Sequence, residues 1–159
     1  MTTLQSNAVK NELESFFNLS VDDQLAFLWY VYEGIGSSIT PAAPGTAGED
    51  IAEGLFNQVK DKSHEEQLQI QRDIAGKKDT QISREYGSLG ENTKLLFWYI
   101  LAQGMEEETI VPMPDDYEMA EKGKNLLAQV QKMEYEKQIT FLREAVMPMG
   151  AEAKSGAGI

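Results

Sequence analysis

The sequence is 159 residues long, carries a formal net charge of -12 at pH 7 and contains no cysteine. An acidic chain repels phosphate backbones, so the composition disfavours a nucleic-acid-binding protein. The lack of cysteine excludes disulfides, thiolate nucleophiles and cysteine-ligated metals, and it suits the cytosol. Because no run of about 18 apolar residues and no basic-then-apolar leader is present, we expect one soluble domain without a membrane span or an export signal.

The first strongly patterned stretch is LAFLWYVYEGIG, at residues 25–36. Most of its positions are apolar, which predicts a helix in the interior of the domain. Ser20 followed by Asp23 resembles a capping box that starts this helix, and Gly36 suits its end. A shorter helix is predicted before it, over residues 8–17, after a loose polar start. The residues that share one face of the central helix are Leu25, Leu28, Trp29, Tyr32 and Ile35.

Residues 37–45, SSITPAAPG, contain two prolines and cannot continue a helix. Thr46 with Glu49, and then Ser63 with Glu66, resemble further capping boxes, so helices are predicted to about residue 60 and about residue 75. The side chains predicted to face inward on these two helices are Ile51, Leu55, Val59, Leu68 and Ile74. The one histidine, His64, lies among acidic residues in a first turn and is predicted to be solvated.

After a short predicted helix at residues 80–89, the stretch LLFWYILAQGM at residues 95–105 repeats the register of the first central helix. Its corresponding positions are Leu95, Trp98, Tyr99, Ala102 and Met105. A proline break at residues 111–115 precedes predicted helices over residues 117–133 and 136–147. No segment alternates with a period of two, so the fold is predicted to be all-α. We expect about eight helices in two sub-bundles, each built around one aromatic-rich helix.

Motifs that carry chemistry are scarce. His64 has no partner for nucleophilic catalysis, no Glu-x-x-His pair suits a bundle metal site, and no phosphate-binding glycine loop occurs. We therefore expect that the protein is not an enzyme and binds no metal. The two aromatic rows leave two interpretations open at this point: they fill an ordinary core, or they line a slot for a long, flat, apolar ligand.

Four segments together resemble the N-terminal domain of the orange carotenoid protein family of cyanobacteria. They are QLAFLWYVYEGIG with the following TPAAPG, NTKLLFWYILAQGM, VPMPDDY and QITFLREAVMPMG. The likeness runs from about residue 16 to residue 150 and is closest to the stand-alone members, the helical carotenoid proteins. It implies two interleaved four-helix bundles that form a single carotenoid-binding domain over residues 1–150, followed by a flexible tail at residues 151–159.

The resemblance also implies a ketocarotenoid, of the canthaxanthin or echinenone type, in a tunnel between the bundles. A polyene has no polar groups along its length, so apolar burial and ring stacking would hold it. The residues implied to line the tunnel are Leu25, Leu28, Trp29, Tyr32, Ile35, Ile39, Pro44, Gly45, Leu95, Trp98, Tyr99, Ala102, Met105, Met113, Pro114, Tyr117, Ile139, Thr140, Arg143, Val146 and Met149.

As a member of this family the chain would be a photoprotective protein that quenches excess excitation of the phycobilisome, singlet oxygen, or both. The implied partners are the carotenoid, the phycobilisome at the thylakoid surface, and a carotenoid-donating protein similar to the family's C-terminal domain. The implied state is a cytoplasmic monomer or weak dimer. Arg143 matches an arginine implicated in docking to the phycobilisome, and a surface ion pair with Glu144 is its alternative interpretation.

The chain departs from the family pattern at the edge of the expected pocket. Gln71 stands where the family has a methionine, Arg72 stands in place of a small residue, and Leu89 replaces a tryptophan before the second central helix. The alternative function is a helical protein-interaction module without a pigment, whose aromatic rows are structural core only.

Overall fold

The computed structural model describes residues 2–35, 47–114 and 116–151. Within these ranges the chain forms helices and loops and no strand, which confirms the predicted all-α fold. The helices are α1 (Thr2–Phe17), α2 (Val21–Ile35), α3 (Ala47–Lys60), α4 (His64–Ala75), α5 (Gln81–Gly87), α6 (Glu91–Glu107), α7 (Glu121–Gln131) and α8 (Tyr135–Val146).

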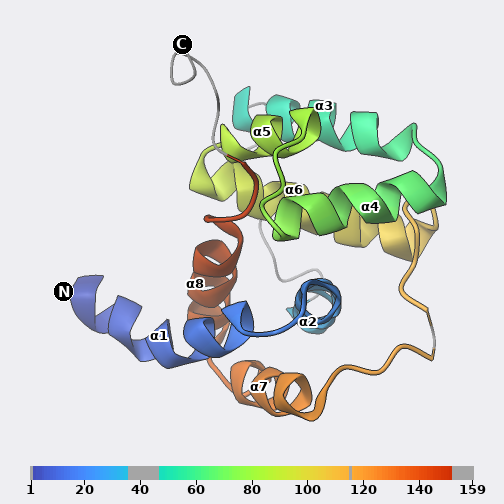
Figure 1. Ribbon diagram of the computed structural model, residues 1–159. Coiled ribbons are helices and arrows are strands. Elements are labelled where there is room, and N and C mark those ends of the chain that lie inside the picture. The colour runs from blue at the N-terminus through green and yellow to red at the C-terminus, as the bar shows by residue number, and fades with distance from the viewer. Residues whose placement is uncertain (1, 36–46, 115, 152–159) are drawn as a thin grey trace.

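The helices form two interleaved four-helix bundles. Helices α1, α2, α7 and α8 form one bundle, and the four helices between them in the chain, α3 to α6, form the other (Figure 1). Helix α2 packs on α7 and α8 within its own bundle and on α4 and α6 of the other. Helix α6 in turn packs on α3, α8 and α2. The two aromatic helices therefore meet at the junction of the bundles, as the repeated register predicts.

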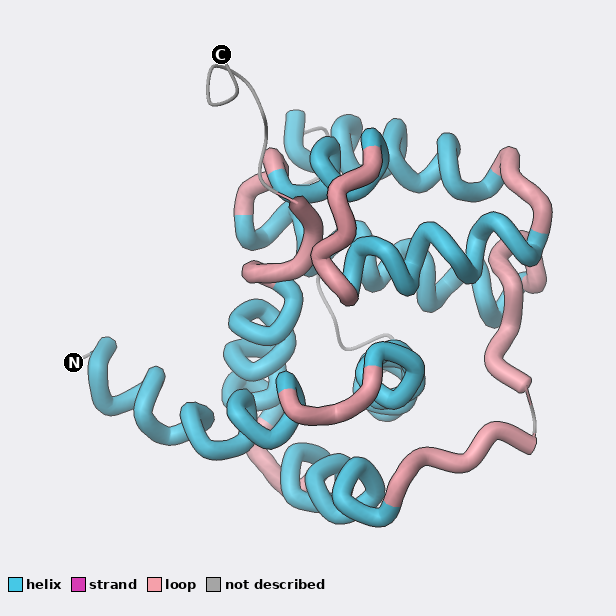
Figure 2. The backbone as a smooth tube through the Cα atoms, viewed as in Figure 1, coloured by secondary structure: helices cyan, strands magenta, loops and turns pink. Residues whose placement is uncertain are grey.

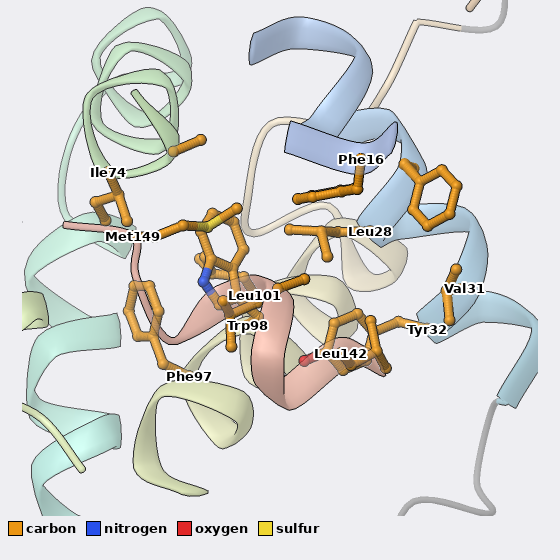
Figure 3. Close-up of a cluster of buried hydrophobic side chains, with 14 of the residues drawn as sticks. Phe16, Leu28, Val31, Tyr32, Ile74, Phe97, Trp98, Leu101, Leu142 and Met149 are labelled. Carbon is orange, nitrogen blue, oxygen red and sulfur yellow. The ribbon is translucent and has the colours of Figure 1, made fainter. Parts of the chain in front are cut away.

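Aromatic side chains fill the interior on both sides of this junction (Figure 3). Phe16 packs edge-on against Phe27 and Phe141, with ring centroids 5.4 and 5.9 Å apart. Tyr86 packs edge-on against Phe97 at 5.6 Å in the other bundle. These rings are fully buried, and burial of such large apolar surfaces is the main favourable contribution to folding.

The end of the described chain is fastened to the second bundle. The amide of Gly150 donates to the carbonyl of Ile74 at 2.8 Å, and the amide of Ala151 donates to that of Ser83 at 3.1 Å. Gly150 adopts φ +83°, and a Cβ atom there would lie 2.6 Å from the ring of Tyr86. Only glycine fits this turn, which brings the segment after α8 back across α4 and α5.

Two predicted capping boxes lie in the described residues. Ser63 and Glu66 form a complete one: the Ser63 hydroxyl accepts from the amide of Glu66, whose carboxylate accepts from the amide of Ser63. At the start of α2 the Ser20 hydroxyl accepts from the amide of Asp23 at 3.1 Å. The Asp23 carboxylate instead bonds the loop before α7, so only half of this box forms.

Three local predictions are wrong. Helix α1 begins at Thr2 rather than at residue 8. Helix α7 begins at Glu121, because the carboxylate of Asp23 binds Tyr117 and the amide of Ala120 in the preceding loop. Ile51 is 53% exposed, since the neighbouring positions Ala52, Leu55 and Val59 supply the buried face of α3.

Candidate functional site: two pockets along α2 and α6

A first pocket of about 150 Å³ lies between α2, α4, the end of α6 and the loop that follows α6. Its wall is mainly apolar. The guanidinium of Arg72 donates to the carboxylate of Asp22 at 2.8 Å at its rim, where both side chains are partly exposed. The residues that line this pocket are Asp22, Leu25, Ala26, Trp29, Leu68, Gln71, Arg72, Met105, Val111, Pro112, Met113, Pro114 and Tyr117.

A second pocket of about 230 Å³ lies on α2 and α6 alone. Tyr32 and Tyr99 stand opposite each other there, with ring centroids 6.3 Å apart. The hydroxyl of Tyr32 donates to the backbone carbonyl of Leu95 at 2.9 Å, which ties α2 to α6. The residues that line this pocket are Trp29, Tyr32, Glu33, Tyr99, Ala102, Gln103 and Glu106.

Trp29 belongs to both pockets and stands between them. On α2 the first pocket takes the earlier residue Leu25 and the second takes the later residue Tyr32. On α6 the first pocket is lined by Met105, and the second by Tyr99, Ala102, Gln103 and Glu106. Helix α2 is seen end-on in Figure 1 while α6 lies across the view, so the two helices cross. The pockets lie along this contact, which we call the seam, and Trp29 forms part of both walls.

The loop that covers the first pocket is held at both ends by buried polar side chains. Gln67 of α4, 1% exposed, donates to the carbonyl of Thr109 at 3.2 Å and accepts from the amide of Val111 at 2.7 Å. At the other end the Asp23 carboxylate accepts from the Tyr117 hydroxyl at 2.5 Å and from the amide of Ala120 at 3.1 Å. This connection passes along one edge of the molecule from the second bundle to the first (Figure 2).

A glycine near the end of α6 allows the loop to begin so close to the helix. The amides of Thr109 and Ile110 both donate to the carbonyl of Gly104, at 3.0 and 3.1 Å. A Cβ atom at Gly104 would lie 2.5 Å from Cγ1 of Ile110, which is fully buried. Any larger residue at this position would push Ile110, and the pocket wall after it, away from α6.

The pKa values of three ionisable groups near the seam, Tyr32, Tyr117 and Arg72, are raised. Burial raises the pKa of Tyr32 well above its usual value. Burial and the hydrogen bond to Asp23 together raise the pKa of Tyr117. The hydrogen bond from Arg72 to Asp22 raises the pKa of the guanidinium. The phenols of Tyr32 and Tyr117 therefore stay neutral and Arg72 stays charged. The wall of the first pocket is mainly apolar, whereas the second also carries Glu33, Gln103 and Glu106 beside its rings.

The described part of the chain contains neither a metal-binding cluster nor a membrane-spanning helix. No cluster of three or more histidine, aspartate or glutamate side chains is arranged to hold a metal ion. Likewise, no helix in those ranges combines the length and apolar character that crossing a membrane needs.

Many of the residues predicted from the sequence do meet at the seam. The predicted residues that line the first pocket are Leu25, Trp29, Met105, Met113, Pro114 and Tyr117. Those that line the second are Trp29, Tyr32, Tyr99 and Ala102. Both sets come from the two central helices and the second proline break.

Other predicted site residues lie elsewhere. Leu95 and Ile139 are partly buried and pack against the core. Thr140 and Arg143 are half-buried on α8, where the guanidinium of Arg143 donates to the amide oxygen of Asn92 at 3.0 Å. Ile39, Pro44 and Gly45 lie outside the described residues. The remaining members of the predicted set, which are buried in the core and line neither pocket, are Leu28, Ile35, Trp98, Val146 and Met149.

The lining also contains residues that the sequence prediction did not assign to the site. Ala26 precedes Trp29 by three positions and Glu33 follows it by four, so helical spacing could have included both. Leu68, Gln71 and Arg72 share one face of α4 for the same reason, and the departures at Gln71 and Arg72 already marked this region. Val111 and Pro112 carry no periodic signal because they lie in a loop.

Comparison with known proteins assigns the family. A family profile described as "Orange carotenoid protein, N-terminal" matches residues 2–152. An orange carotenoid-binding domain-containing protein of Nostoc sp. is 49% identical over 92% of this chain and 85% of the relative. The orange carotenoid-binding protein of Synechocystis sp. is 36% identical over 95% of this chain. The chain spans about half of that relative's length, 48%.

Solved structures agree in fold. The Red Carotenoid Protein of Anabaena (Nostoc) sp., solved with canthaxanthin bound, superposes with a TM-score of 0.80 at 49% identity, over 91% of this chain and 99% of that one. The Orange Carotenoid Protein of the same organism, also with canthaxanthin, gives 0.85 at 37% identity over 93% of this chain and 48% of that one. The chain belongs to the family of orange carotenoid protein N-terminal domains.

Proposed function

We propose that this chain binds a ketocarotenoid of the canthaxanthin type along the seam between α2 and α6. The observation that carries the proposal is the pair of pockets on either side of Trp29, in a chain that is 49% identical to a protein solved with canthaxanthin. A polyene offers only apolar surface along its length, and rings such as Trp29, Tyr32 and Tyr99 offer matching surface with little side-chain entropy to lose.

The proposed contacts are the predicted residues that line the pockets, together with Ala26 and Leu68. Contacts from Ile39, Pro44 and Gly45, and from α8 and the core positions, stay predictions. Residues 1–150 form the proposed carotenoid-binding unit, which suits the fastening of Gly150 and Ala151 onto the second bundle.

The pigment needs more room than either pocket holds. Their volumes, about 150 and 230 Å³, are each below the roughly 300–1,000 Å³ of usual small-molecule sites. A C40 pigment would therefore occupy both and displace partly buried side chains between them. Met105 and Met113 suit this, because unbranched methionines repack easily.

Pigment uptake tests the proposal directly. We expect purified pigment-free protein, mixed with canthaxanthin in detergent, to give a coloured 17.7 kDa species that retains carotenoid absorbance through size-exclusion chromatography. The absorbance maximum should shift to the red of free canthaxanthin, because burial orders the polyene among polarisable rings. Protein that elutes colourless, with its helical circular dichroism intact, would contradict the proposal and favour the pigment-free interaction module.

We further propose that the loaded protein is photoprotective, either at the phycobilisome or as a scavenger of singlet oxygen in the cytoplasm. The family assignment supports this role, and Arg143, whose side chain is half-exposed on α8, is the proposed docking residue. A protein resembling the family's C-terminal domain is the proposed carotenoid donor.

Fluorescence separates the two photoprotective roles. If the loaded protein quenches the antenna, the fluorescence of isolated phycobilisomes will fall when it is added, and Arg143→Ala will restore most of it. Pigment-free protein is the matched control. Unchanged fluorescence together with a shortened singlet-oxygen luminescence lifetime would contradict docking and support the scavenger role.

A further inference from the structure

Three glutamines on one helix differ in how their amides are used. On α4, Gln67 is 1% exposed and has every polar atom of its side chain bonded, through the carbonyls of Lys60, Lys62 and Thr109 and the amide of Val111. Gln69 is exposed and donates to the carboxylate of Asp73 at 2.9 Å. Gln71 is 5% exposed, and its Nε2 has no hydrogen-bond partner among the described residues.

The side chain of Gln71 lines the first pocket, and its unpaired nitrogen is buried within the wall. Gln71 lines it one helical turn beyond Gln67, opposite Leu25 and Trp29 of α2. A buried donor without a partner forfeits the hydrogen bonds that it made to water in the unfolded chain, so the fold keeps it at a cost. Most of the surrounding wall is apolar, and the charged pair Arg72–Asp22 already satisfies itself at the rim.

We propose that Nε2 of Gln71 donates a hydrogen bond to the ring carbonyl oxygen of a bound ketocarotenoid, so that this pocket selects a 4-oxo ring over an unsubstituted one. The inference rests on the proposed function, because it needs a carotenoid in the seam. The last torsion of a glutamine side chain is broad, so the amide can turn its N–H toward a ligand in the pocket.

The chemistry of the free atom selects a carbonyl rather than a hydroxyl. A carbonyl only accepts, so pairing with Nε2 leaves no new polar hydrogen in the apolar wall. A ring hydroxyl would bring its own donor, which would need another acceptor there. A methionine at this position, as the family pattern has it, cannot donate at all.

Competitive loading tests the proposal. Pigment-free protein is incubated with an equimolar mixture of canthaxanthin and β-carotene, and the pigments retained after gel filtration are extracted and quantified. Replacing Gln71 by leucine or methionine removes the donor and keeps the apolar volume. We expect the canthaxanthin to β-carotene ratio to fall about tenfold in both variants, the size of one net hydrogen bond of about 1.4 kcal/mol.

Gln69→Leu is the matched control, because it removes an exposed amide from the same helix and should leave the ratio as in the wild type. In a parallel competition between zeaxanthin, whose rings carry hydroxyls, and β-carotene, the wild-type protein should show no comparable preference for zeaxanthin. A tenfold drop in the zeaxanthin to β-carotene ratio in the Gln71 variants would overturn the assignment of the hydrogen bond to a carbonyl.

Vibrational spectroscopy gives a second readout. In the wild type, one of the two canthaxanthin C=O stretching bands should lie at lower frequency than the other. In Gln71→Leu both bands should fall at the frequency of a carbonyl without a hydrogen bond. Two equal, unshifted bands in the wild type would overturn the proposal even if both variants bind pigment.

Stability separates a ligand donor from a structural amide. Without pigment, Gln71→Leu should melt at or above the wild-type temperature, since no bond of Nε2 is lost. Gln67→Leu should melt at least about 5 °C lower, because it breaks a fully bonded buried amide. Wild-type protein that takes up neither pigment contradicts the proposed function itself. Uptake of both pigments with one ratio in the wild type and the variants contradicts only the assignment to Gln71.

Discussion

Trp98→Ala should lower the free energy of unfolding of the pigment-free protein by about 3–5 kcal/mol, the usual cost of deleting a buried large aromatic ring. Trp98 is 4% exposed and packs edge-on against Phe97 and Tyr86, at 5.9 and 6.2 Å. Its indole N–H donates to the Tyr86 hydroxyl at 2.9 Å, and that hydroxyl donates to the carbonyl of Val146 at 2.7 Å. The substitution thus opens a cavity and disrupts a buried hydrogen-bond chain that links α6, α5 and α8.

Urea unfolding followed by circular dichroism measures this loss. Trp98→Phe is the control, because it keeps a ring while it removes the indole N–H and part of the ring volume, so a smaller loss of about 1–2 kcal/mol is expected. If Trp98→Ala leaves the stability of the pigment-free protein within about 1 kcal/mol of the wild type and abolishes pigment uptake, Trp98 is a pigment contact rather than a structural residue.

Trp29→Ala should have the opposite effect: a large loss of pigment binding and a small loss of stability. The side chain is half-buried between the two pockets, and its ring forms part of both walls. Loss of such a central aromatic anchor should weaken carotenoid binding by about 30–100-fold, equivalent to about 2–3 kcal/mol of buried ring surface. The melting temperature of the pigment-free protein should change by only a few degrees, because the pockets already leave part of the ring uncovered.

Pigment transfer from detergent, measured by absorbance at rising canthaxanthin concentration, gives the affinity, and calorimetry without pigment gives the stability. Trp29→Phe should recover most of the binding, because a smaller ring still stacks on a polyene. Equal losses of stability and binding in Trp29→Ala would show that Trp29 is core and that the binding site lies elsewhere.

The two tryptophans occupy neighbouring positions of the repeated helical register: Trp29 is its fifth residue and corresponds to Tyr99, whereas Trp98 is one residue earlier in the register and corresponds to Leu28. Periodicity specifies which residues share a face of one helix, and it says nothing about which neighbour covers that face. Around α2 the covering elements leave space beside Trp29. Around α6, Tyr86 of α5 and the end of α8 close over Trp98. The matched residues Trp29 and Tyr99 therefore line pockets, while the matched residues Leu28 and Trp98 lie in the core.

The loop before α7 also shows that helical periodicity does not predict contacts between distant elements. The spacing of residues 117–133 favours a helix, yet Tyr117 and the amide of Ala120 bond to Asp23, a residue 94 and 97 positions away. This buried carboxylate outweighs the local preference for helix, because an unpaired buried charge would cost more than a turn of helix is worth. The result places Tyr117 in the wall of the first pocket.

The sequence by itself determined the all-α class, the two central aromatic helices, the capping box at Ser63 and Glu66, and the family. These features depend on local spacing and on motifs that can be recognised without knowing which elements pack against them. Only the tertiary structure decided that Trp29 borders space while Trp98 does not, and that Gln71 is buried with a free donor one turn from the fully bonded Gln67. Both depend on contacts between elements far apart in the chain, and such contacts leave no periodic signal in any one of them.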